Sequence, residues 1–382
     1  MVAAGAAAGA LGVSAAGAAT RALHQARTSL ASARQMAVPG AKLWVQRYNG
    51  PGNGSDAASS VAASPGGGTV FVTGASTGAT SFSDYLTVAY NAATGARLWT
   101  ARYNGPGNGG DGAASVAVSP DGATVFVTGT SGGASNSDFA TVAYRAADGT
   151  QLWVTRFNGP ANDFDGAAAV SVARDGTEVF VTGTSFWNGD AASGMATVAY
   201  GATDGAQLWV ARLNGPAGNT GARAIVSPGG NRVFVTGEVQ SKAVTAEYGT
   251  VAYNATTGAR LWARRYAGQG ATSIAVSPDL KKVYVTGESH GDYGTLAYSA
   301  RTGAQLWARF YGGRRSGEFA NSVAVSPGGT VLVTGGSRAP SLNTDYATVA
   351  YSPGGHQLWA RRYSGPGNHS DIADAVAAPG KA

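Results

Sequence analysis

The sequence predicts an all-β protein, a β-propeller of four-stranded antiparallel blades. Leu-Trp pairs recur at steps of 45 to 56 residues, with the tryptophans at Trp44, Trp99, Trp153, Trp209, Trp262, Trp307 and Trp359. Each interval holds short runs rich in β-branched and aromatic residues, bounded by Gly, Pro, Asn or Asp. No long window within residues 42–378 has helical periodicity. A repeat of about 50 residues made of short strands is typical of a propeller or another closed array.

One repeat shows the four expected strands of a blade. They are an Ala/Val run ending in Ser-Pro (Ser115–Pro120), then Thr124–Gly129, Phe139–Tyr144 and Gln151–Phe157. Ser-Pro-Asp-Gly joins the first two runs, and Ala-Asp-Gly-Thr joins the last two. Pro presets φ and Gly accepts positive φ, so both connections are expected to be tight hairpins on one face.

The other connections are expected on the opposite face. Those between second and third strands vary from copy to copy, and Thr184–Gly194 is the longest. Those between fourth and first strands begin with Asn-Gly-Pro in four copies, and three of these four end in an aspartate, at Asp56, Asp111 and Asp165. A recurring aspartate is expected to accept hydrogen bonds from its own loop. Variable loops on a repeated scaffold are where binding sites usually lie, so we expect any ligand on this face.

The two ends of the repeat region are incomplete. Lys42–Tyr48 resembles a fourth strand with no first three, and Ile372–Ala378 resembles a first strand with nothing after it. We therefore predict six complete blades plus an incomplete seventh closing blade, and a six-bladed ring is the alternative. The two middle strands of the seventh blade are absent from the sequence, which would leave exposed strand edges.

Residues 1–39 differ from the rest of the chain. They form an Ala/Gly-rich leader in which Ala16-Gly17-Ala18 resembles a signal-peptide cleavage site, although no basic segment precedes it. A disordered low-complexity leader is the alternative. The leader is too weakly apolar for a transmembrane span. We therefore divide the chain into a leader, residues 1–39, and a propeller, residues 40–382, and expect an extracytoplasmic or secreted protein.

Composition narrows the functional classes. The chain has no cysteine, so it can form no disulfide and do no thiol chemistry. The net charge of +6 comes largely from arginines scattered over the repeats, whereas a nucleic-acid surface needs clustered basic residues. We expect a monomer that does not bind nucleic acid.

The segment Ala89–Trp99, AYNAATGARLW, resembles the tryptophan-docking motif of bacterial quinoprotein propellers that use the cofactor PQQ, with Asn91 in place of the usual Asp. The motif recurs four more times, and weakly before Trp359. The TVFVTG and SDY runs are also similar to SBBP-type propeller repeats. The resemblance implies that each Trp packs between neighbouring blades. It implies little about activity, since such propellers include dehydrogenases, assembly factors and binding proteins.

We predict no catalytic residues, no metal ligands and no cofactor. Quinoprotein dehydrogenases also use an acidic base, Ca²⁺ ligands and often a vicinal cysteine pair, and we identify no such set here. The four histidines are not at ligand spacing. The first strands, which line the central channel of a propeller, read ASVAVS or similar and offer no carboxylate or imidazole. The alternative, a PQQ-type oxidoreductase or a metal-assisted lactonase-like hydrolase, would require PQQ or Ca²⁺.

Residues that break the repeat are the candidate ligand contacts. Phe186, Trp187 and Asn188 lie in the longest loop, and an aromatic beside a polar residue can stack on a sugar or a peptide. Arg314, Arg315 and Glu318 replace a Gly-Pro-Gly-Asn loop and offer a site for an anion. The alternatives are an aromatic folded onto its own blade and solvated loop charges. The sequence thus predicts an exported scaffold that binds a small ligand, a protein or a glycan.

Overall fold

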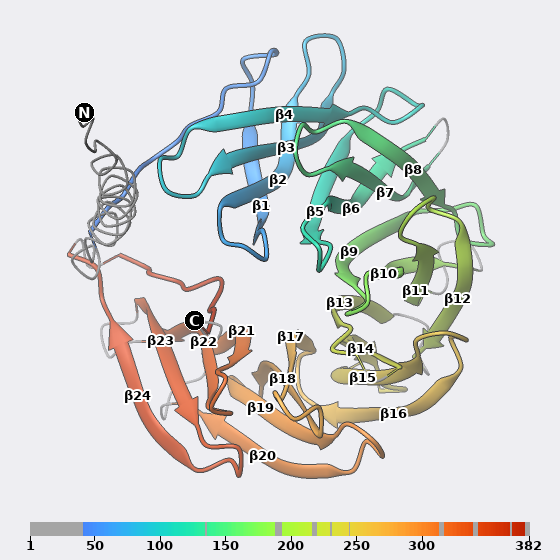
Figure 1. Ribbon diagram of the computed structural model, residues 1–382. Helices are drawn as coiled ribbons and strands as arrows, with labels where there is room; N and C mark the ends of the chain where they lie inside the picture. Colours follow the sequence, from blue (N-terminus) through green and yellow to red (C-terminus); the bar gives the residue numbers. More distant parts are fainter. Residues whose placement is uncertain are drawn as a thin grey trace, which may run out of the picture. The chain divides into compact units, whose positions relative to one another are not determined.

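The structure is a computed structural model that describes residues 41–378, apart from 134–135, 188–192, 216–219, 230, 244, 313–316, 339–342 and 367–368. The described residues form β-strands, turns and loops, with no helix among them. The strands make six four-stranded antiparallel sheets, each in chain order (Figure 1). The all-β propeller fold and its six complete blades are therefore confirmed.

Contacts divide the chain into two compact units. One contains Ala93–Gly95 and the chain up to Arg47, and the other contains Tyr48–Ala92 and the chain from Ala96 onward. All the strands belong to the second unit. The predicted leader, residues 1–39, lies outside the described residues.

Each sheet repeats the same four positions. The first strands are β1 (Asp56–Ala63), β5 (Asp111–Val118), β9 (Asp165–Val172), β13 (Thr220–Val226), β17 (Ala271–Val276) and β21 (Phe319–Val325). The second strands are β2 (Thr69–Thr77), β6 (Thr124–Gly132), β10 (Glu178–Phe186), β14 (Arg232–Gln240), β18 (Lys282–Ser289) and β22 (Val331–Arg338). The third strands are β3 (Ser83–Asn91), β7 (Ser137–Arg145), β11 (Ser193–Gly201), β15 (Ala246–Asn254), β19 (Asp292–Ser299) and β23 (Thr344–Tyr351). The fourth strands are β4 (Arg97–Tyr103), β8 (Gln151–Phe157), β12 (Gln207–Asn214), β16 (Arg260–Ala267), β20 (Gln305–Tyr311) and β24 (Gln357–Tyr363). Three of the first strands, β1, β5 and β9, begin at the loop aspartate, earlier than the Ala/Val pattern suggested.

The core lies between successive sheets, and tryptophans dominate it. Trp153 of β8 packs on Phe126 of its own sheet and on Tyr200 of the next sheet, with ring centroids 5.8 and 6.5 Å away. Its indole N–H donates to the carbonyl of Ala202, 3.0 Å away. The neighbouring Leu152 is 43% exposed. Strand alternation therefore places Trp153 inward and Leu152 outward, and Trp153 packs between neighbouring sheets as the docking motif implies.

Buried threonines connect the two middle strands of every sheet. In the second sheet, the Thr128 and Thr141 hydroxyls lie 3.0 Å apart, and that of Thr128 also donates to the carbonyl of Ala140. The equivalent pair occurs in the other five sheets. Because each hydroxyl has a partner, the threonines of the TVFVTG and TVAY runs can be buried without leaving polar atoms unsatisfied.

Two predicted strands are absent. Lys42–Tyr48 and Ile372–Ala378 are both irregular in the structure. A strand needs a paired neighbour, and the sequence has no middle strands for either segment to pair with. Ile372–Ala378 nevertheless lies beside β21, where the Val376 N–H donates to the Ser322 hydroxyl at 3.2 Å. The same contact joins β5 to β1 and β9 to β5, so the segment takes the place of a seventh first strand.

Candidate binding site at the strand bulges

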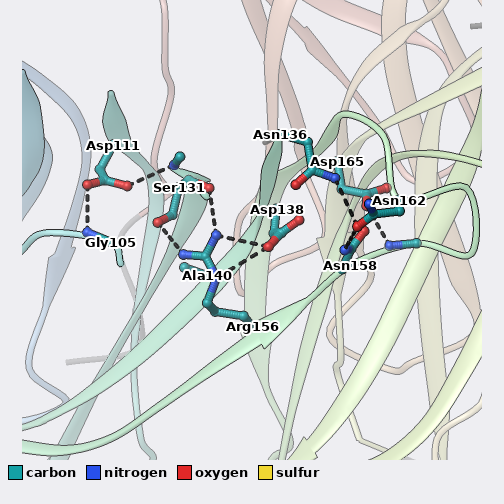
Figure 2. Close-up of polar contacts among 12 residues, drawn as sticks. Gly105, Asp111, Ser131, Asn136, Asp138, Ala140, Arg156, Asn158, Asn162 and Asp165 are labelled. Carbon is teal, nitrogen blue, oxygen red and sulfur yellow. Dashed lines mark hydrogen bonds and ion pairs between the residues drawn. The ribbon is translucent and has the colours of Figure 1, made fainter. Parts of the chain in front are cut away.

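Hydrogen bonds within the Asn-Gly-Pro loops that end at Asp56, Asp111 and Asp165 hold those loops together. In the loop from Asn104 to Asp111, the Asn104 amide donates to Asn108, and the Gly105 N–H donates to the Asp111 carboxylate at 2.7 Å. Figure 2 shows this carboxylate held from two sides, the second donor being the N–H of Gly132. Asn108 has a φ of 49°, in the left-handed region. The Asn–Asn contact and the Gly N–H donor recur in the loops that end at Asp56 and Asp165, so the expected hydrogen bonding of these aspartates to their own loops is confirmed.

A second repeated network of hydrogen bonds and ion pairs joins the third and fourth strands at the face that carries the variable loops, here called the variable-loop face. Arg156 of β8 donates to the carboxylate of Asp138 at 2.9 Å and to the hydroxyl of Ser131 at 2.6 Å (Figure 2). Burial lowers the pKa of the Arg156 guanidinium, but hydrogen bonds to Tyr103 and Asp138 outweigh it and leave the pKa above its ordinary value. Arg102 with Asp84 repeats the arrangement. These charges stabilise the fold and are not available to a ligand.

Glu318, one of the predicted ligand contacts, belongs to this scaffold. It occupies the position that Asp111 has in the second sheet and is fully buried. Its carboxylate accepts hydrogen bonds from Arg362 at 3.0 Å and from Ser337 at 3.2 Å. The predicted solvent-accessible site at Glu318 is therefore wrong. Arg314 and Arg315 lie outside the described residues.

The predicted aromatic contacts lie on the third sheet. Phe186 ends β10 and packs edge-on against Phe164, which is 47% exposed, with ring centroids 6.3 Å apart. Trp187 folds onto its own sheet. Its ring lies so close to Gly194 that a Cβ there would be 2.1 Å from it, and the Arg212 guanidinium lies 5.4 Å from the ring centroid. Asn188 lies outside the described residues. Phe186 and Trp187 are thus on a different sheet from Glu318, so the three predicted contacts that the structure describes do not share one site.

A polar cavity that the sequence reasoning missed lies beside this face. It has a volume of about 580 Å³ and is lined by Ala168, Arg223, Glu238, Thr272 and neighbouring residues from β9, β10, β11, β13, β14 and β17. Arg223 and Glu238 are its two charged side chains, with guanidinium nitrogen and carboxylate oxygen 3.9 Å apart. The guanidinium side chain is 61% exposed and the carboxylate side chain 32% exposed. Aligning the six first strands would have shown Arg223 as the one arginine in its column.

The opposite face has a cavity of its own, of about 460 Å³. Arg174, which stands where the other five copies carry the proline of Ser-Pro, lines it together with Glu178 and Arg232. Burial, and then the charge of Asp175, raise the pKa of the Glu178 carboxyl. Within the described ranges, no three or more His, Asp or Glu side chains lie together as metal ligands. No helix in the part of the chain that the structure describes has the length and hydropathy of a membrane span.

Comparisons with known proteins agree with the fold. A family model described as outer membrane protein assembly factor BamB, of the PQQ-like repeat class, matches residues 194–380. Among curated proteins the search finds no match. Hydrazine synthase of Kuenenia stuttgartiensis aligns with a TM-score of 0.53 and 12% identity over 76% of each chain. The periplasmic gluconolactonase PpgL of Pseudomonas aeruginosa aligns with a TM-score of 0.52 and 16% identity, over 82% of this chain and 87% of that one. BamB from Moraxella catarrhalis has a TM-score of 0.47 and 14% identity, over 81% and 78%.

The six sheets, the docked tryptophans and the matched repeats lead to one assignment. The structural neighbours share the fold at low identity, and the family match covers the C-terminal sheets. The chain is a β-propeller protein whose residues 194–380 match a model of PQQ-like repeats.

Proposed function

We propose that this protein is a non-catalytic binding scaffold that works outside the cytoplasm and recognises its ligand at the variable-loop face. The observation that carries the proposal is the charged pair Arg223 and Glu238 in a solvent-open cavity. Arg102, Arg156 and Arg362, by contrast, are each held by a carboxylate at 3.0 Å or less in the scaffold network. A charge that the fold does not use, beside loops that vary, is typical of recognition.

The location outside the cytoplasm has two supports. The sequence begins with a leader that resembles a secretion signal, and the family model that matches residues 194–380 is described by an outer-membrane assembly function. Fractionation of cells expressing the full chain with a C-terminal tag tests this part. We expect the protein outside the cytoplasm, and expect deletion of residues 1–39 to retain it inside. Retention of the full chain in the cytoplasm would contradict the proposal.

Binding is tested by a thermal-shift screen of the purified protein with sugars, sugar acids, amino acids and short peptides. We expect at least one compound to raise the melting temperature of the wild type and of Arg174→Ala, but not of Arg223→Ala. Arg174 lines the cavity on the opposite face and is the matched control. A compound that stabilises all three proteins equally would place recognition elsewhere.

No cofactor is part of the proposal. The same screen includes PQQ and Ca²⁺, and NMR of each stabilising compound after incubation shows whether it is converted. A rise in melting temperature with PQQ or Ca²⁺, together with conversion of a compound, would favour the enzyme alternative.

A further inference from the structure

The cavity residue Arg223 owes its direction to a β-bulge. In every sheet the pairing between first and second strands skips one residue, which leaves that residue unpaired. The bulge residues are Ser59, Ala114, Ala168, Arg223, Thr272 and Asn321. A bulge re-aims the side chain of its unpaired residue away from the regular alternation. The bulges of β9, β13 and β17 line the same cavity, so their side chains face one space.

The polar bulge residues next to Arg223 serve the scaffold. The Thr272 hydroxyl donates to the carbonyl of Ala320 at 2.7 Å, and the Asn321 amide donates to the carbonyl of Ala373 at 3.0 Å. Thr272 thus bridges to the following first strand, β21, and Asn321 bridges to the irregular segment Ile372–Ala378. Arg223 makes no such bridge, and among the described residues no acceptor lies within hydrogen-bond distance of its guanidinium.

The pair formed by Arg223 and Glu238 is too weak to explain the arginine. At 3.9 Å and with the guanidinium mostly exposed, the attraction is screened by water and contributes little to folding. The neighbours of Arg223 are small, since Ala168, Gly221 and Ala222 also line the cavity. The long side chain therefore has room to turn toward a ligand.

From these contacts we propose that the cavity binds a small hydroxylated carboxylic acid, of the sugar-acid class. This inference rests on the proposed function and names its ligand. A guanidinium presents parallel N–H donors that match the two oxygens of a carboxylate. Glu238 accepts hydrogen bonds, and the Thr184 hydroxyl also lines the cavity, so ligand hydroxyls meet complementary groups.

Charge and size exclude other ligands. Glu238 repels a phosphate dianion more strongly than a monoanionic carboxylate, because the repulsion grows with ligand charge. Among the described residues that line the cavity none is aromatic, which disfavours an apolar ligand. Its volume of about 580 Å³ lies in the range of small-molecule sites and accommodates a mono- or disaccharide acid.

The test is isothermal titration of the full-length protein with galacturonate and glucuronate, each compared with its neutral parent sugar. We expect at least one acid to bind about tenfold or more tightly than its neutral parent, as a charge-assisted hydrogen bond requires. We expect Arg223→Ala to remove that preference, Arg223→Lys to keep part of it, and Arg174→Ala to leave it unchanged. The Arg223 side chain is mostly exposed and its pair with Glu238 contributes little to folding, so the variants should melt close to the wild-type temperature.

The possible outcomes separate a failure of this inference from a failure of the proposed function. If a neutral sugar or an amino acid binds, and Arg223→Ala abolishes that binding, the cavity is a binding site but the ligand class is wrong. If acids bind equally to the wild type and Arg223→Ala, or if neither acid binds at all, the sugar-acid site is overturned. If no compound in the wider screen depends on Arg223 either, the proposed function fails with it.

Discussion

At the scale of single residues, one glycine per turn makes the docking of each tryptophan possible. Gly205 has a φ of 69°, and a Cβ there would lie 2.7 Å from the Trp153 ring. The equivalent glycines in the turns that face Trp99, Trp209, Trp262 and Trp307 are also at positive φ and equally close to an indole. Glycine therefore meets two requirements at once, the left-handed backbone and the space for the ring.

Gly205→Ala separates these two requirements when it is compared with Gly67→Ala. Gly67 has the same φ of 69° but no heavy atom within 4 Å of the added Cβ. We expect Gly67→Ala to lower the free energy of unfolding by about 1 kcal/mol, because alanine is strained in the left-handed region. We expect Gly205→Ala to lower it by about 2 kcal/mol or more, because the Trp153 indole must also move. Urea denaturation of both variants measures the difference. Equal losses would show that the indole contact adds nothing.

A turn aspartate gives the protein part of its acid sensitivity. The Asp148 carboxylate accepts the Thr150 N–H at 2.9 Å and pairs with Arg145. The backbone hydrogen bond from Thr150, followed by the other partners, lowers the pKa of this carboxyl to about 2 from its ordinary 3.8. Since the folded-state pKa is depressed, the stabilisation is present above about pH 4 and is lost as the pH falls toward 2.

Asp148→Asn tests that dependence. We expect the variant to melt below the wild type at about pH 6, and the gap to shrink between about pH 4 and pH 2, where the wild-type carboxylate becomes protonated. Thermal melts followed by circular dichroism at several pH values measure it. A gap that stays constant over this range would mean that the carboxylate charge has no role in the turn.

At the scale of the sheet, the buried ion pairs hold the third strand to the fourth at the variable-loop face. Asp138 is 8% exposed and depends on Arg156 and its neighbours to satisfy its charge. The pair of Arg145 with Asp148 has the same residue types, but both side chains are about half exposed. The two pairs of one sheet therefore provide a matched comparison of burial.

We expect Arg156→Met to lower the free energy of unfolding by about 2–4 kcal/mol, because it leaves a buried carboxylate without its cation. Arg145→Met should cost no more than about 1 kcal/mol, since an exposed ion pair is screened. Chemical denaturation of both variants checks this. Restoring stability in the double variant Arg156→Met, Asp138→Leu would support the cause, whereas equal costs of the two single variants would refute it.

At the scale of the whole molecule, stability comes from contacts between successive sheets. The tryptophans of the first five sheets are 6% to 9% exposed, because each is covered by the sheet that follows. Trp359, in the sixth sheet, is 39% exposed, and Tyr363 at the end of the same strand is 50% exposed. The same sequence motif is thus buried to different extents according to its place in the array.

Trp153→Ala and Trp359→Ala measure how much the burial of a tryptophan under the following sheet contributes to stability. We expect Trp153→Ala to lower the free energy of unfolding by about 3–5 kcal/mol, because the side chain is buried. We expect Trp359→Ala to lower it by about 1–2 kcal/mol, because the half-exposed side chain buries less apolar surface. The midpoint of guanidinium unfolding, followed by intrinsic fluorescence, gives the order. A loss at Trp359 as large as at Trp153 would show that another group covers the sixth sheet in solution.

The sequence by itself determined the repeat, the four strands of each blade, the tight turns and the inward tryptophans. These features are local or periodic, so alternation, turn residues and the recurring Leu-Trp pair were enough to predict them. The same local pattern misled at Lys42–Tyr48 and Ile372–Ala378, because a strand depends on its neighbours and not on its own residues alone.

Only the tertiary structure decided which unusual residues share a site. Glu318 looked like a loop charge in the sequence, and the fold buries it under Arg362. Arg223 looked like one more surface arginine, and a bulge places it in a cavity opposite Glu238, from a different strand. The physical reason is that a bulge and a cavity are set by the register between strands and by three adjacent sheets, which no single stretch of sequence specifies.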